Sequence, residues 1–151
     1  MSAPLEPQRT NLTEDAVAWL IGKSVVDVRF AAPESWWFHF TDVAYLAAHG
    51  GPWRIVGPSK LIASSADHAQ DFGLGRPSDQ AEQARLSLQG RVVRGVRIGS
   101  GAPDLVVSLD GELSLEFLAV SRGYECWESR DPAGRTVVVD GDRHASAYQG
   151  P

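Results

Sequence analysis

Cysteine is nearly absent from this 151-residue sequence, in which Cys126 is the only one. A single cysteine excludes an internal disulfide framework and is typical of proteins in a reducing compartment. Long apolar runs are missing too, so the sequence offers no membrane-spanning segment. Residues 1–10 also lack the apolar run of a signal peptide. We therefore expect a cytoplasmic protein that has no membrane partner.

Basic residues are in the minority, with 14 Lys and Arg against 19 Asp and Glu and a formal net charge of −5. The acidic excess is spread over both halves of the chain. Because the phosphate backbone of nucleic acid is itself negative, a mildly acidic protein surface disfavours binding to it. Nucleic acid is therefore a disfavoured partner.

The residue patterns that mark common enzyme sites are also missing. The sequence has no nucleophile elbow, zinc-binding helix, phosphate-binding glycine loop or dinucleotide fingerprint. The histidines His39, His49, His68 and His144 lack the spacing of metal ligands, and no base adjoins Cys126 in the sequence. We therefore expect no catalytic residue, no metal and no cofactor, and hence a protein that is not an enzyme.

What the sequence does contain is an internal repeat. Residues 20–30 align without gaps onto residues 88–98 at an offset of 68. Trp53 and Pro58 match Trp127 and Pro132 at an offset of 74. The growth of the offset predicts a longer loop in the second copy. The alternative is chance similarity between valine-rich strands.

The two copies are predicted over residues 13–63 and 78–139, joined by a linker at 64–77 within one domain of residues 1–151. Each copy opens with the signals of a short helix, Thr13 being the N-cap of the first, and continues with β-branched runs typical of strands. We expect a mainly β, α+β fold. In it, two degenerate helix-plus-antiparallel-sheet repeats pack around a shared core with approximate two-fold symmetry. Whether they form one sheet or two is left open.

The register of one hairpin, residues 104–117, is argued from its apolar pattern. A two-residue loop would mix apolar and polar partners on both faces. A three-residue loop at 109–111 opposes Val107 to Leu113 and keeps the apolar partners on one face. We therefore predict that loop, with Gly111 in the left-handed conformation of a bulged turn. The last ten residues of the chain are expected to be loose.

The aromatic segment 36–40 is predicted to be a strand. Alternation then sends Trp36, Phe38 and Phe40 to one side and Trp37 to the other, together with His39. We favour a covered Trp37. The alternative is an exposed tryptophan, which would be a candidate anchor for a partner.

Several motifs together resemble a known family. They are the Leu-x-Gly-[Lys/Arg]-x-Val-x-x-Val opening, a glycine-turn hairpin, Tyr-Glu-x-Trp at 124–127 and a Pro-x-Gly turn at 132–134. They resemble those of small two-repeat bacterial proteins of unknown function, some of which look like immunity proteins in polymorphic-toxin loci. The resemblance covers about residues 20–63 and 88–139. It implies a non-catalytic protein-interaction module, most concretely an immunity-type inhibitor of a bacterial toxin, and supplies no catalytic residue.

Two functional classes remain. In the first, a protein partner, such as a cognate toxin with a basic cleft, binds Glu125, Glu128, Asp131 and Trp37. Glu128 and Asp131 are expected to face solvent, so that reversing both charges leaves folding intact. Glu125 is expected to share a face with Trp127 at the edge of the core. In the second class, a small molecule or lipid binds in a pocket between the two repeats.

Overall fold

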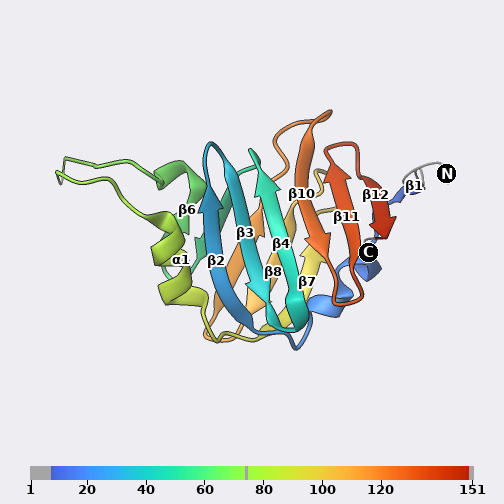
Figure 1. The fold of residues 1–151 in the computed structure, drawn as a ribbon, viewed down its shortest axis with the longest axis horizontal. Helices are drawn as coiled ribbons and strands as arrows, with labels where there is room; N and C mark the ends of the chain where they lie inside the picture. The colour runs from blue at the N-terminus through green and yellow to red at the C-terminus, as the bar shows by residue number, and fades with distance from the viewer. Residues whose placement is uncertain (1–7, 74, 150–151) are drawn as a thin grey trace, which may run out of the picture.

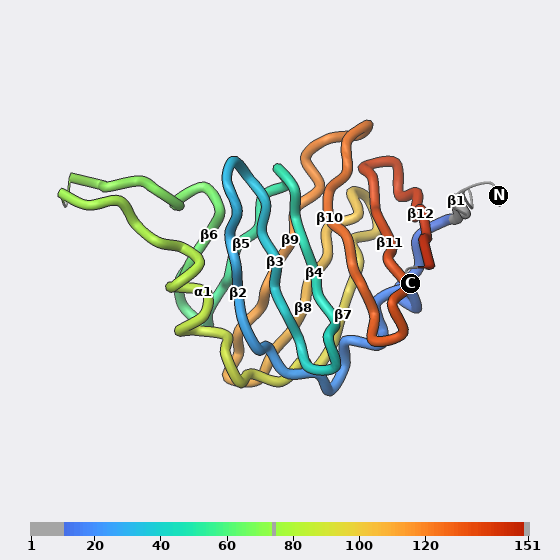
Figure 2. The backbone as a smooth tube through the Cα atoms, in the orientation of Figure 1, coloured from blue at the N-terminus to red at the C-terminus, as the bar shows by residue number. Residues whose placement is uncertain are grey.

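The structure is a computed structural model that describes residues 8–73 and 75–149. Its core lies between two antiparallel sheets that pack face to face (Figures 1 and 2). The first sheet contains β1 (Gln8–Asn11), β2 (Val25–Ala31), β3 (Ser35–Phe40), β4 (Ala44–His49), β10 (Glu125–Arg130), β11 (Arg135–Asp140) and β12 (His144–Gln149). The second contains β5 (Trp53–Val56), β6 (Leu61–Ser64), β7 (Val93–Ile98), β8 (Leu105–Leu109) and β9 (Leu113–Phe117). The prediction of a mainly β, α+β fold is confirmed, with two packed sheets.

The chain visits the two sheets in the same order twice. The first sheet has the order β1-β12-β11-β10-β4-β3-β2, and the second has the order β6-β5-β9-β8-β7. Thus the meander β2-β3-β4 is followed by a hairpin, β5-β6, that joins the other sheet. The meander β7-β8-β9 is likewise followed by a hairpin, β10-β11, that crosses back (Figure 1). Each hairpin therefore extends the meander of the other copy.

The two tryptophans of the repeat occupy corresponding positions. Trp53 lies two residues before Ile55, which pairs with Leu115 in the meander of the second copy. Trp127 lies two residues before Ser129, which pairs with Leu46 in the meander of the first copy. Both indoles are buried between the sheets. The repeat boundaries at 13–63 and 78–139 remain a prediction.

Reciprocal backbone bonds join the two copies where they meet. Residues 22–25 run antiparallel to residues 90–93, with a single β-bridge between Ser24 and Val92. The glycine N–H in each segment donates to a valine carbonyl of the other, at 2.9 Å in both cases. Such a pair of exchanged bonds is what an approximate two-fold axis through the bridge requires.

The helix of the second copy covers an edge of the first sheet. Helix α1 (Gln80–Leu88) lies beside β2, where Arg85 Nη1 donates to the carbonyl of Val28 at 2.7 Å. Gln89 Nε2 donates to the carbonyl of Val26 at 3.0 Å. An uncovered edge strand presents unpaired backbone groups to other chains, so these bonds protect β2.

The predicted helix of the first copy is wrong in type. This segment forms two 3-10 turns, η1 (Glu14–Ala16) and η2 (Ala18–Leu20), and the Thr13 side chain makes no cap hydrogen bond. Val17 between them has φ −123° and ψ 2°, outside the helical region. Without a side-chain cap, the first backbone N–H groups of this segment lack the hydrogen bond that stabilises the start of an α-helix. The turns nevertheless lie beside β7, where Glu14 Oε1 accepts from the N–H of Ile98 at 3.3 Å.

The predicted register of the β8–β9 hairpin is wrong by two residues. Leu109 opposes Leu113 and Val107 opposes Leu115, so the loop is 110–112 instead of 109–111. The loop length and the shared apolar face agree with the prediction. The difference arises because Leu109 is buried in the core, while the Asp110 side chain turns back to accept from the N–H of Val92 at 3.0 Å.

The end of the chain is also more ordered than expected. Residues 144–149, expected to be loose, form β12, which pairs with both β11 and β1. Serine and alanine carry little strand propensity, so the sequence pattern is weak here. Pairing on both edges, with Ala145 buried in the core, supplies the stabilisation instead.

Candidate interaction surface

One face of the seven-stranded sheet is uncovered. It is turned to the viewer in Figure 1, and no helix or strand of the described chain lies in front of it. Cross-strand neighbours with outward side chains form rows across it. We call the central part of these rows the outer face, formed by Trp37, His39, Tyr45, His49, Glu128 and Arg130.

Glu128 is the centre of the outer face. Its side chain is only 16% exposed. One carboxylate oxygen accepts from the hydroxyl of Tyr45 at 3.4 Å, and the other is hydrogen-bonded to His49 Nε2. His49 Nδ1 lies 2.9 Å from the hydroxyl of Ser35, and the His49 ring packs edge-on against Trp37 with 5.3 Å between centroids. The neighbouring strands β3 and β4 thus hold this carboxylate in one orientation.

Two pKa shifts favour the uncharged forms of Tyr45 and His39 on the outer face. Burial, with the nearby Glu128 charge, raises the pKa of Tyr45, so its hydroxyl stays a donor. Burial, with the nearby Arg29 charge, lowers the pKa of His39 and favours its neutral ring. The outer face therefore places the neutral side chains of Tyr45 and His39 near the partly buried carboxylate of Glu128.

The contacts Ser35–His49–Glu128 have the order of nucleophile, base and acid in hydrolases. A hydrolase site also needs donors for the developing oxyanion and a cavity for the substrate. Cavities of about 500, 430 and 470 Å³ in the structure are all lined by other residues. What the contacts themselves show is that Ser35 and His49 orient the carboxylate of Glu128.

The structure brings Trp37 and Glu128 together through His49. The predicted alternation in β3 is confirmed, since Trp36, Phe38 and Phe40 are buried. Trp37 is half-buried on the opposite side, between the covered state that was favoured and the exposed alternative. Glu128 lies on the uncovered side of the sheet, but its carboxylate is less exposed than expected because Tyr45 and His49 of β4 contact it.

The other two predicted residues lie at opposite ends of β10. Glu125 is exposed at its start, and a β-bulge at Cys126 buries both that residue and Trp127. The bulge breaks the alternation, so Glu125 does not lie at the core edge as expected. Asp131 follows the end of β10, and its Oδ1 accepts from the backbone N–H groups of residues 133 and 135, both at 2.9 Å. Charge reversal at Asp131 would remove both of these bonds, so the structure argues against the tolerance predicted for this residue.

Tyr45, His49 and Ser35 were not predicted from the sequence. The hairpin register would have revealed part of the outer face, since Ser35 opposes His49 and Trp37 opposes Ala47. The pairing of β4 with β10 brings Glu128 next to Tyr45 and His49. Tyr45 and Glu128 are 83 residues apart in the sequence, so no local pattern relates them.

Two features are absent from the described residues, 8–73 and 75–149. No group of three or more His, Cys, Asp or Glu side chains among them is arranged to hold a metal ion. No helix among them is long and apolar enough to cross a membrane. No protein-family model, curated protein or solved structure matches this chain.

Proposed function

We propose that the protein is a non-catalytic protein-interaction module that binds its partner through the outer face. The observation that supports this is the oriented carboxylate of Glu128, which lies beside Trp37 on a sheet face that no described element covers. Interface hot spots combine an aromatic anchor with a polar group at the centre of the contact. Side chains that are already held in place also lose less conformational entropy on binding.

The partner we propose is a bacterial toxin, which the protein would inhibit in the cytoplasm as an immunity protein. This part rests on the family resemblance and on the net charge of −5. Acidic inhibitors associate rapidly with basic clefts, because opposite charges steer the encounter. Within the outer face, Glu128 would meet a cationic group of the toxin and Trp37 would fill an apolar pocket.

The test is co-purification with the product of the neighbouring gene, followed by affinity measurements on variants. Trp37→Ala removes the anchor and is expected to weaken binding about tenfold or more. Glu128→Gln keeps the size and an acceptor but removes the charge. It is expected to slow association and to flatten its salt dependence.

A matched control lies on the outside of the other sheet. Arg54 forms an exposed ion pair with Glu116 at 2.8 Å there, and Arg54→Ala is expected to leave binding unchanged. Thermal denaturation of each variant confirms that it is folded. Full affinity in both Trp37→Ala and Glu128→Gln would exclude the outer face as the binding surface.

A further inference from the structure

The two copies differ in how the turns after corresponding strands are built. In the second copy β7 and β8 are joined by residues 99–104, and in the first copy β2 and β3 are joined by residues 32–34. In the second copy β9 and β10 are joined by residues 118–124, whereas residues 50–52 join β4 and β5. The second copy therefore has more chain available to fill the space beside its buried tryptophan.

That space is closed in the second copy by the chain itself. The indole Nε1 of Trp127 donates to the carbonyl of Pro103 at 2.9 Å. Arg143 Nη1 donates to the carbonyl of Gly101 at 3.2 Å and also to that of Gly99. The turn after β7 is thus bonded to both Trp127 and the turn before β12.

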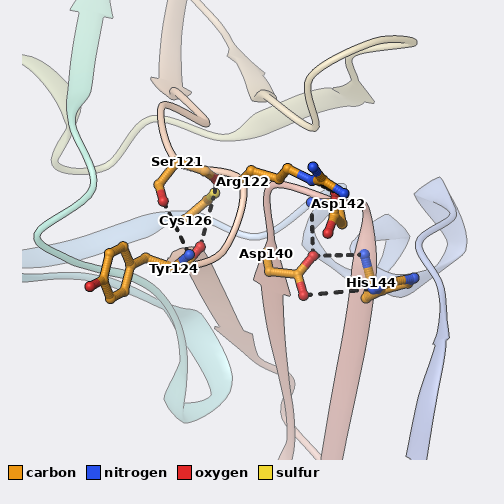
Figure 3. A network of polar contacts seen from close by, with 7 residues as sticks. All are labelled: Ser121, Arg122, Tyr124, Cys126, Asp140, Asp142 and His144. Carbon is orange, nitrogen blue, oxygen red and sulfur yellow. Dashed lines mark hydrogen bonds and ion pairs between the residues drawn. The ribbon is translucent and has the colours of Figure 1, made fainter.

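Figure 3 shows the second closing contact, between the loop before β10 and the turn between β11 and β12. Arg122 Nε donates to Asp142 Oδ1 at 2.9 Å, and the Cys126 thiol donates to the carbonyl of Ser121. Gly141 packs so tightly that a Cβ there would lie 1.9 Å from the carbonyl oxygen of Ser121. This loop and this turn are therefore in direct contact at Gly141.

The corresponding space in the first copy is a cavity of about 430 Å³. Its walls include Phe30, Trp36 and the ring of His68, which follows η4 (Ser65–Asp67). Trp53 lies behind Trp36, with 4.9 Å between the two ring centroids. The indole Nε1 of Trp53 is buried and has no hydrogen-bond partner among the described residues, unlike that of Trp127. The shorter turn leaves both the orphaned N–H and the cavity.

His68 offers this cavity a hydrogen-bond donor. Its Nδ1 accepts from the backbone N–H of Gln80 at 3.1 Å, so in the neutral ring the proton is on Nε2. Nε2 has no partner among the described residues. The ring is held by Phe30 at 4.4 Å and Trp36 at 4.9 Å between centroids. The ring that carries this donor, in a residue lining the cavity, is therefore held by its neighbours.

Glu34 supplies an acceptor at the rim of the same cavity. A Cβ added to Gly50, which also lines it, would lie 3.2 Å from Glu34 Oε2. The cavity thus pairs aromatic walls with a donor and a carboxylate, and its volume is within the range of small-molecule sites. Phe30 and His68 are half-buried and offer ring surface on which a flat ligand can stack, whereas Trp36 is only 3% exposed.

We propose that this cavity binds a small flat heteroaromatic molecule, the size of a nucleobase, with an amino group and a ring-nitrogen acceptor. The amino group donates to Glu34, and the ring nitrogen accepts from His68 Nε2. The site lies within the first copy and linker, whereas the sequence-based alternative placed a ligand between the repeats. It does not depend on the outer face, because none of its lining residues belongs to that face.

The test is a titration of the full chain with adenine, followed by the indole N–H resonances in NMR spectra. Saturable shifts of the Trp36 and Trp53 signals are expected, while the Trp127 signal, already bonded to Pro103, stays in place. Benzoate is flat but lacks the amino group and repels Glu34, so it is expected to bind about tenfold more weakly or not at all.

Two variants locate the site. Ala66 lines the cavity and is exposed, so Ala66→Trp is expected to block adenine without disturbing the core. Val120→Trp, at an exposed position of the second copy, is the matched control and keeps full binding. Glu34→Gln tests the acceptor independently and is expected to weaken adenine about tenfold. Absence of saturable binding, or unchanged binding in both Ala66→Trp and Glu34→Gln, would overturn the proposal.

Discussion

Left-handed backbone conformations occur at corresponding places in the two meanders. In the β8–β9 loop, Gly111 has φ +78° and Glu112 has φ +59°. In the β3–β4 loop, residues 41–43, Asp42 has φ +66° and Val43 has φ +62°. A side chain in this region is strained, since its Cβ approaches the backbone carbonyl. Glycine removes that strain at one position of the β8–β9 loop, residue 111, and at neither position of the β3–β4 loop.

The residue-scale prediction is that Gly111→Ala destabilises the protein by about 1 kcal/mol. The new Cβ would also lie 2.6 Å from Arg91 Nη1, a flexible group that can move away. Chemical denaturation gives the free energy of unfolding. Gly123→Ala is the control, since a Cβ there meets no atom within 4 Å and its φ is not left-handed. An unchanged denaturation midpoint for Gly111→Ala would contradict the loop geometry.

At the scale of elements, the two helical segments have different structures but the same role, which is to cover an edge strand. Both lie beside an edge strand of the other copy and bond to its backbone, through Arg85 in α1 and Glu14 in η1. In α1 the carboxylate of Asp79 accepts from the N–H of Glu82 at 3.1 Å, whereas Thr13 leaves the first N–H groups without a side-chain partner. An α-helix therefore forms in one copy and two 3-10 turns in the other.

This difference predicts unequal effects of removing the two N-cap residues. Asp79→Ala is expected to cost about 1 kcal/mol, because it removes a cap hydrogen bond at the start of α1. Thr13→Ala is expected to lower the free energy of unfolding by only a few tenths of about 1 kcal/mol, which is close to the limit of detection. Thermal denaturation of both variants under one condition provides the measurement. Equal losses would show that the two segments depend on their caps alike.

At the scale of the molecule, neither copy completes its own sheets. Strand β5 of the first copy pairs with β9 of the second, and β10 of the second pairs with β4 of the first. The buried residues of both copies also form one cluster. Separating the copies would expose the edges of both meanders and the apolar side chains that the copies bury against each other.

We therefore predict that fragments 1–74 and 75–151 are each unfolded alone and form the native sheets when mixed. Far-UV circular dichroism and dispersion of amide NMR signals report folding of each fragment and of the mixture. The full chain under the same conditions is the reference. Cooperative unfolding of either fragment by itself would show that one copy is an independent domain.

Much of the outer face could be anticipated from the alternation of residues along each strand. Segment 36–40 places Trp37 opposite three buried aromatics, because successive side chains of a strand point to opposite sides. The same rule fails at Glu125, where the bulge at Cys126 adds a residue. It also says nothing about the partners of Glu128, since those depend on which strands are neighbours.

The sequence by itself determined the class of fold, the repeat offsets and the inward side of the regular strands, because these follow from local periodicity and from similarity between segments. The tertiary structure decided the exchange of hairpins between copies, since strand pairing at long separation depends on the shared core. It also decided that Glu128 is enclosed by Tyr45 and His49, and that Trp127 has a carbonyl partner where Trp53 has none. These contacts depend on loop lengths and on packing between distant strands, which periodicity does not record.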